Sequence, residues 1–259
     1  MSQSQERICD FTALLLIFLF LLIVDYSART KSLTVDEYAH ITAGAHLVSS
    51  GNNDLIPEAG YLSLAWPAIV VSKLGYPQPE EKGKSAGSFA KVADSYFANL
   101  GDELPSVLLM ARRAVMWSAC LLALVVYLWA RKLHGPLGGL VSLTVFVFSP
   151  TVIAHSRLAN TDILVSLFWL LSLWAMWRVL NRVTIVSVLF CGVIVGLALL
   201  VKFSTLLIAP LALLLIALRL SSPEPLLVGD SRSVSGWTTV GLLAASVFMA
   251  VLISVFVIW

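Results

Sequence analysis

Two adjacent carboxylates and a histidine stand together just after the first long apolar run of the chain, in the stretch TVDEYAH from Thr34 to His40. A carboxylate held close to a hydroxyl group can take its proton, which is the task of a general base in group transfer. We therefore expect Asp36 to be a catalytic base and Glu37 to be a second catalytic carboxylate that supports it.

Two other roles are open for the same stretch. Thr34 and Glu37 have the spacing of a capping box, which would make them the start of a helix. Asp36 and His40 lie four residues apart and could share a divalent metal, although their order differs from the His-Glu-x-x-His zinc pattern. The sequence gives no certain cofactor, and a divalent metal stays an open alternative.

Basic side chains follow at what would be the ends of apolar segments, where ionisable groups are costly and tend to be paired or functional. They are Arg112, Arg113, His155, Arg157 and Lys202, and Asp162 shares a turn with two of them. Fixed Arg and Lys side chains can bind a phosphate leaving group. With a carboxylate base, they suit transfer of a sugar from a lipid phosphate, because the sugar gains positive charge and the phosphate negative charge. We expect this set, together with His40, to bind substrate.

Each of these residues could also have a purely structural role. The adjacent arginines could extend their stems toward lipid headgroups, and His155 could be an ordinary polar loop residue. Arg157 and Asp162 could form an ion pair that holds their turn. Lys202 could be an interfacial anchor. A binding role is favoured because the predicted topology places all of them on one side of the membrane.

The composition requires a membrane. Of the 259 residues, 59% are hydrophobic and only 12% are charged, and the mean hydropathy is +0.91. Soluble domains carry about 25% charged residues. The net charge of +2 argues against a nucleic-acid partner. The three cysteines lie in or beside apolar runs, so we interpret them as packing residues.

The apolar runs predict an all-α integral membrane protein, a multi-pass helical bundle of about seven spans in one domain. The expected spans are residues 8–24, 108–130, 137–154, 162–178, 184–201, 203–219 and 237–259. Residues 25–105 would form a long loop without a span, carrying surface helices, with an interfacial or re-entrant segment around Pro67. Because the last run continues to Trp259, a further C-terminal part is left open.

The short loops decide the orientation through their basic residues. Alternating spans place Arg7, Arg131, Lys132, Arg178, Arg182, Arg219 and Arg232 on one side. The opposite short loops carry Arg157 and Lys202. We therefore expect a cytoplasmic N-terminus and an outward loop over residues 25–105, with the Asp36 cluster on the outward face.

Taken together, these residues resemble the multi-pass glycosyltransferases of the GT-C fold, in the protein mannosyltransferase and aminoarabinose-transferase-like group. The features that match, over about residues 30–215, are Asp36-Glu37-x-x-His40, Ala111-Arg112-Arg113, Ser149-Pro150, Ser156-Arg157-x-Ala159-x-x-Asp162 and Val201-Lys202-Phe203-Ser204 with Pro210. Their order and spacing make the resemblance fairly specific.

The resemblance implies a polyprenyl-phosphate sugar donor, an acceptor on a protein, lipid or polysaccharide, and surrounding membrane lipids. It implies the role of base or acceptor-binding group for Asp36 and contact with the lipid phosphate for Arg157. We expect an inverting glycosyltransferase, and we favour a bacterial inner membrane over the endoplasmic reticulum. Relatives often carry a Pro-Glu-His-Pro-Pro-Leu segment where residues 57–62 read PEAGYL. A non-catalytic module that binds lipid-linked sugar is therefore the alternative, and a small transporter is less favoured because no internal repeat is visible.

Overall fold

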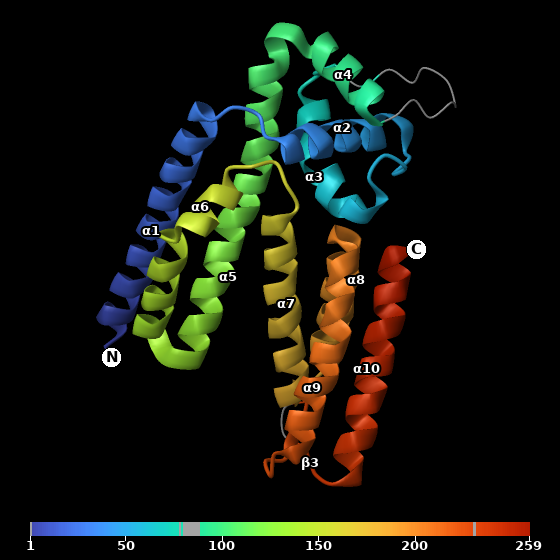
Figure 1. Cartoon of the computed structure of the whole chain (residues 1–259). Coiled ribbons are helices and arrows are strands. Elements are labelled where there is room, and N and C mark those ends of the chain that lie inside the picture. Colours follow the sequence, from blue (N-terminus) through green and yellow to red (C-terminus); the bar gives the residue numbers. More distant parts are fainter. Residues whose placement is uncertain (1, 78, 80–88, 230–231) are drawn as a thin grey trace. The chain divides into compact units, whose positions relative to one another are not determined.

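The computed structural model describes residues 2–77, 79, 89–229 and 232–259. Its regular structure is nearly all helical (Figure 1), which confirms the predicted all-α membrane class. The chain divides into two compact units, Met1–Leu167 and Phe168–Trp259. Most of the predicted outward loop falls in the described part, whereas its residues 78 and 80–88 lie outside it.

The first unit is built on two long helices, α1 (Gln3–Thr30) and α5 (Leu104–Val147). α5 consists of two limbs, because its backbone leaves helical geometry at Gly135, where φ is 77°. Glycine adopts this conformation without steric cost, and Pro136 lacks the N–H that would continue the helical hydrogen bonds. The chain reverses direction at this point (Figure 1).

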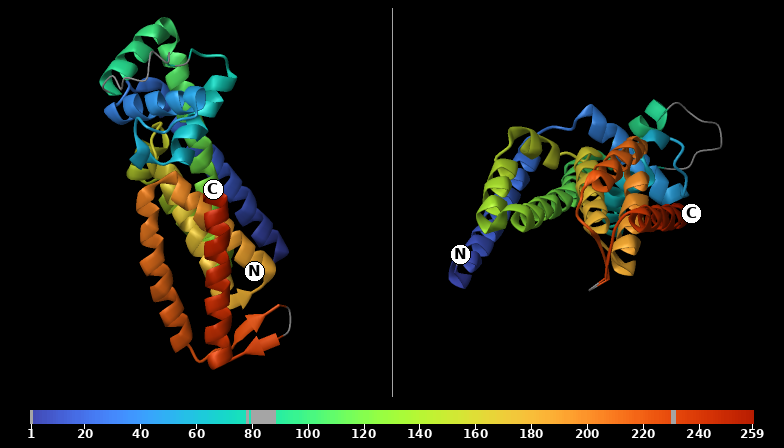
Figure 2. Two further views of the ribbon diagram at one scale, coloured as in Figure 1. Left: turned by 90° about the vertical axis from the view of Figure 1, so that its right-hand side faces the viewer. Right: turned by 90° about the horizontal axis from the view of Figure 1, so that it is seen from below.

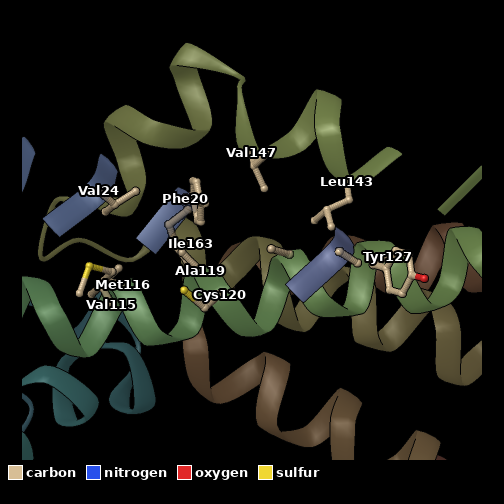
Figure 3. Close-up of a cluster of buried hydrophobic side chains, with 12 residues drawn as sticks. Phe20, Val24, Val115, Met116, Ala119, Cys120, Tyr127, Leu143, Val147 and Ile163 are labelled. Carbon is tan, nitrogen blue, oxygen red and sulfur yellow. The ribbon is translucent and has the colours of Figure 1, made fainter. Parts of the chain in front are cut away.

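The core of the first unit lies between α1 and the two limbs of α5. Phe20 of α1 is fully buried, as are Val115 of the first limb and Leu143 of the second (Figure 3). Between helices that lie in lipid, such close packing stabilises mainly through van der Waals contacts, because lipid tails are as apolar as the side chains. The packing of apolar faces therefore fixes α1 against the α5 hairpin.

The predicted outward loop is largely helical. It contains α2 (Val35–Ser50), the short 3₁₀ helix η1 (Pro57–Ala59), α3 (Tyr61–Lys73), α4 (Phe89–Leu100) and the 3₁₀ turn η2 (Gly101–Glu103). α3 continues through Pro67 without a break. α2 and α3 cross closely at Gly44, where an added Cβ would lie 2.6 Å from the carbonyl oxygen of Leu64.

Two further helices follow α5 in the chain, and the second of them continues into the second unit. α6 (Pro150–Ser156) follows a break at Phe148 and Ser149, and α7 is Asp162–Asn181. The turn between them holds several of the polar residues that the sequence singles out. The predicted span 137–154 thus consists of the second limb of α5 followed by the short helix α6.

The second unit contains α8 (Ile185–Val201), η3 (Phe203–Leu207), α9 (Ile208–Ser221) and α10 (Trp237–Ile258). α8 and α10 pack closely, and the Ser254 hydroxyl donates to the Gly192 carbonyl at 2.8 Å. A small sheet has the order β1 (Arg182–Val183), β2 (Leu226–Val228) and β3 (Arg232–Val234). β1 and β2 are parallel, and β2 and β3 form an antiparallel hairpin just before α10 (Figure 2).

Five helical stretches among the described residues are long and apolar enough to cross a membrane. They are Gln3–Thr30, Phe89–Val147, Asp162–Asn181, Phe203–Leu220 and Trp237–Ile258, and Ile185–Val201 is a shorter apolar helix. The second stretch includes the reversal at Gly135. The number of seven spans stays a prediction.

Candidate functional site

Glu37 lies at the centre of the polar residues of the first unit, and its side chain is fully buried. The Arg112 guanidinium binds it in a fork: Nε lies 2.6 Å from Oε1 and Nη2 lies 2.8 Å from Oε2. Arg112 is itself 2% exposed. Two parallel charge-assisted hydrogen bonds of this kind are strong and geometrically specific.

Glu37 also caps its own helix. The backbone N–H and the hydroxyl of Thr34 each donate to Oε2 of Glu37 at 3.1 Å. The Glu37 N–H donates back to the Thr34 hydroxyl at 3.3 Å. The predicted capping box is therefore present, and it starts α2 where the chain leaves α1.

Arg112 uses every N–H group of its side chain. Besides the two bonds to Glu37, Nη1 donates to the carbonyls of Ala28 and Lys31 at 2.6 and 2.8 Å, and Nη2 donates to that of Ser32 at 2.8 Å. Carbonyls at the end of a helix lack intrahelical partners. Arg112 satisfies them and so joins the end of α1 to the start of α2.

A third element reaches the same carboxylate. The backbone N–H of Ala159, in the turn between α6 and α7, donates to Oε1 of Glu37 at 3.0 Å. Burial opposes the charge on Glu37, but the hydrogen bonds from Arg112, Ala159 and Thr34 outweigh it and hold the pKa of Glu37 below its ordinary value. Glu37 is thus an ionised carboxylate whose oxygens are fully occupied.

Asp36 directly precedes Glu37 in the chain, but its side chain has the opposite environment. It is exposed and makes no hydrogen bond or ion pair with the described residues. His40 lies one helical turn further along α2 and is half-buried. It lines a cavity of about 10 Å³, close to the size of one water molecule, together with Ser63 and Tyr96.

The remaining arginines lie against the last turns of α1. Nε of Arg113 donates to Asp25 at 3.0 Å, and Asp25 also accepts from Arg29 at 2.6 Å. Nη1 of Arg157 donates to the Ser27 hydroxyl at 2.9 Å. Its buried Nε has no hydrogen-bond partner in the described part of the chain. Both side chains keep N–H groups that could bind an anion.

Asp162 pairs with His155, so the alternative of an Arg157–Asp162 ion pair is wrong. Nδ1 of His155 lies 2.8 Å from Oδ2 of Asp162. The side-chain amide of Asn160 donates to the same oxygen at 3.1 Å. Arg157 is drawn away because it bonds Ser27 on α1.

Lys202 belongs to the second unit, at the junction of α8 and η3. It is half-buried, and its carbonyl accepts from the N–H of Thr205 at 3.0 Å. The same unit contains a cavity of about 420 Å³ among α7, α8, α9 and α10, lined almost entirely by apolar side chains such as Leu199, Ile216 and Val251.

Around Glu37, the first unit brings together the start of α2, the end of α1, the first limb of α5, and the α6–α7 turn with the last turn of α6 and the first turn of α7. These elements carry eight of the nine predicted site residues: Asp36, Glu37, His40, Arg112, Arg113, His155, Arg157 and Asp162. Sequence reasoning missed Asp25, Ser27 and Asn160. Asp25 and Arg29 have the i, i+4 spacing of a helical ion pair, which was the available signal. No group of three or more His, Cys, Asp or Glu side chains is placed to hold a metal within the described ranges.

The first unit thus combines apolar helices long enough to cross a membrane with an exposed carboxylate at the start of α2 and arginines bonded to the last turns of α1. The sequence model of the dolichyl-phosphate-mannose-protein mannosyltransferase family matches residues 95–259, well over half of the chain. The chain belongs to this family, which confirms the resemblance to GT-C glycosyltransferases. Neither the curated proteins nor the solved structures give a match. The matched region contains Arg112 and the α6–α7 turn, whereas α2 with Asp36 precedes it.

Proposed function

We propose that this membrane glycosyltransferase moves a sugar from a polyprenyl-phosphate donor to an acceptor hydroxyl, with inversion at the anomeric carbon and with Asp36 as the general base. The observation that carries the proposal is the contrast between neighbours. Glu37 is buried and fully bonded, whereas Asp36 is exposed and unbonded within the described chain. A base needs a lone pair that the substrate can reach, and Asp36 offers one.

In this proposal, Glu37 and Arg112 hold the site in place and do not take part in the chemical step. Their paired side chains hold the end of α1, the start of α2 and the α6–α7 turn together. The backbone at Asp36 is thereby fixed beside the turn that carries Arg157 and that is flanked by His155 of α6 and Asp162 of α7. Because all five N–H groups of Arg112 are occupied, we assign it no direct contact with substrate.

The proposed chemical step uses the Asp36 carboxylate and the arginine N–H groups that have no hydrogen-bond partner among the described residues. The acceptor oxygen attacks the anomeric carbon from the face opposite the phosphate and gives its proton to Asp36. The bond from that carbon to the phosphate oxygen breaks, and its electron pair stays on the phosphate. The unused N–H groups of Arg113 and Arg157 are suited to bind the phosphate, since guanidinium groups recognise it through several hydrogen bonds.

The apolar cavity of the second unit supports a lipid-linked donor. Its apolar walls would accept an isoprenoid chain, which could pass into it from the lipid without exposure to water. We further propose that the site faces the non-cytoplasmic side, as the basic loops favour. The family description makes mannose the first sugar to test.

The test is sugar transfer by purified protein in nanodiscs, given a panel of radiolabelled polyprenyl-phosphate sugars and native membrane extract as acceptor. Asp36→Asn should lower turnover by on the order of 100-fold or more, because general base catalysis contributes that much. Asp102→Asn is the matched control, since Asp102 is an exposed carboxylate in the same predicted loop. Full transfer by folded Asp36→Asn would overturn the assignment.

The non-catalytic module is the second candidate, favoured by the segment at residues 57–62. There Glu58 and Ala59 occupy η1, and the histidine and later prolines of relatives are replaced. This candidate predicts donor binding by the wild type with no product from any acceptor.

A further inference from the structure

A carboxylate-bound histidine, His155, lies in the last turn of α6, and its partner Asp162 is the first residue of α7. Oδ2 of Asp162 is 2.8 Å from Nδ1 of His155 and accepts from the Asn160 amide at 3.1 Å. The side-chain oxygen of Asn160 in turn accepts from the Asp162 backbone N–H at 3.3 Å. The carboxylate is held from two directions, so it fixes the orientation of the imidazole ring.

The bonding pattern determines which ring nitrogen carries a proton. An ionised carboxylate can only accept hydrogen bonds, so Nδ1 of His155 must be the donor. Nε2 has no partner in the ranges that the structure describes. The side chains of His155 and Asp162 are 43% and 46% exposed. Nε2 is therefore oriented by its neighbours and open to a ligand.

The α6–α7 turn is fastened beside the proposed base. Ala159 donates to Glu37, which directly follows Asp36 in the chain. Arg157, two residues after His155, keeps a buried Nε without a partner in the described part. An imidazole and a guanidinium thus occupy one short segment, on the element that contacts the α2 start.

We infer that His155 is the catalytic acid of the transfer, and that Asp162 and Asn160 are its positioning residues. This inference rests on the proposed function. As the acceptor oxygen bonds the anomeric carbon and gives its proton to Asp36, the bond to the phosphate oxygen breaks. The departing phosphate takes the Nε2 proton of the His155 imidazolium, which becomes neutral imidazole and is reprotonated from water.

Other charged groups lie on the elements that pack against this turn. They are Asp25, Tyr26, Arg29 and Lys31 at the end of α1, Asp36, Glu37 and His40 on α2, and Arg112 and Arg113 on α5. None of them bonds His155 within the described chain. Asp25 bonds both Arg29 and Arg113, and Glu37 bonds Arg112. Among the described residues, the imidazole of His155 therefore has only Asp162 and Asn160 as bonded neighbours.

The first experiment measures kcat and KM against pH for the full chain in nanodiscs, with the donor that the wild type uses. His155→Gln should lower kcat by about 100-fold or more with KM changed only a few-fold, and the fall in rate with rising pH should disappear. His46→Gln is the matched control, because His46 forms a similar pair with Asp54 at 3.0 Å. It should keep both the rate and the pH profile. His155→Asn repeats the test if the glutamine variant does not fold.

The affinity for a lipid phosphate tests the role of His155 without requiring sugar transfer, and so separates this inference from the proposed function. Farnesyl monophosphate is titrated into each variant on both sides of neutral pH. Loss of a charged hydrogen bond should weaken binding to His155→Gln by about 10-fold at the lower pH, and less at the higher pH. The phosphate of the ligand changes its charge with pH in the same way for the wild type and for His155→Gln. A difference in affinity between the two proteins therefore comes from the imidazole of His155.

If the wild type transfers no sugar, the proposed function fails, and the binding difference still decides whether His155 donates to phosphate. If transfer proceeds normally in folded His155→Gln and binding is equal at both pH values, the inference is overturned while the proposed function stands. Asp162→Asn should alter the pH profile of kcat, whereas a purely structural Asp162 would change only the melting temperature.

Discussion

Glu37→Gln tests whether the Glu37–Arg112 pair holds the first unit together. The substitution keeps the size of the side chain but removes the charge opposite a guanidinium that is 2% exposed. Breaking a buried ion pair by removing one partner costs about 3–5 kcal/mol, because the other charge stays buried. An exposed ion pair contributes about 0–1 kcal/mol. We therefore expect a loss of stability several times larger than any surface carboxylate would give.

The chain supplies its own reporter for the measurement. Cys9, Cys120 and Cys191 are free and buried, so a thiol-reactive dye records unfolding in detergent. Glu37→Gln should unfold at a lower temperature and at a lower denaturant concentration than the wild type. Asp36→Asn, one residue away and without a partner in the described chain, is the matched control and should unfold with the wild type.

A double substitution sharpens the test. Replacing both partners of a buried pair by apolar residues is often neutral, but here Arg112 also binds the carbonyls of Ala28, Lys31 and Ser32. Glu37→Leu with Arg112→Leu should therefore recover only part of the loss. A Glu37→Gln protein as stable as Asp36→Asn would refute the reasoning.

The remaining predictions concern pH and packing. The pKa of Glu37 is lowered in the folded protein. Its contribution to the free energy of unfolding is therefore complete above the ordinary pKa of about 4.3 and is lost as the pH falls through the folded pKa. The difference in stability between the wild type and Glu37→Gln should shrink over the same pH range, which denaturation at several pH values measures. A hydrogen bond to Asp94, at 2.6 Å, and burial raise the pKa of Tyr38 to about 12. The stabilisation by this hydrogen bond is complete below about pH 10 and is lost as the pH rises through about 12. Asp94→Asn should therefore lower the pKa of Tyr38 toward about 10, which the ultraviolet absorbance of tyrosinate measures. Gly192→Ala should destabilise the protein by about 1–3 kcal/mol, because its Cβ would lie 2.7 Å from Cβ of Ile253, whereas Gly241→Ala meets open space and should not.

The helices were predictable because each depends on local sequence. Apolar runs of sufficient length give the membrane helices, and the Thr-x-x-Glu spacing at Thr34 and Glu37 gives the start of α2. Gly135 followed by Pro136 marks the reversal inside α5. The three short strands were missed, since two or three residues carry no periodicity to recognise.

The site was predictable in its residue types but not in its pairing. Glu37 and Arg112 are 75 positions apart, and no local pattern tells which of two adjacent carboxylates turns inward. The capping box could have indicated it, because the Glu37 side chain must fold back toward Thr34. The sequence allows an ion pair between Asp162 and Arg157, but in the structure Asp162 binds His155 because Arg157 bonds Ser27 on α1.

The most direct measurement of the central claim is the turnover number of Asp36→Asn with a polyprenyl-phosphate sugar, at equal amounts of folded protein and with donor binding measured separately. We expect donor affinity and melting temperature to stay near those of the wild type, while turnover falls by on the order of 100-fold or more. Turnover at the wild-type rate in a folded, donor-binding Asp36→Asn protein would contradict it.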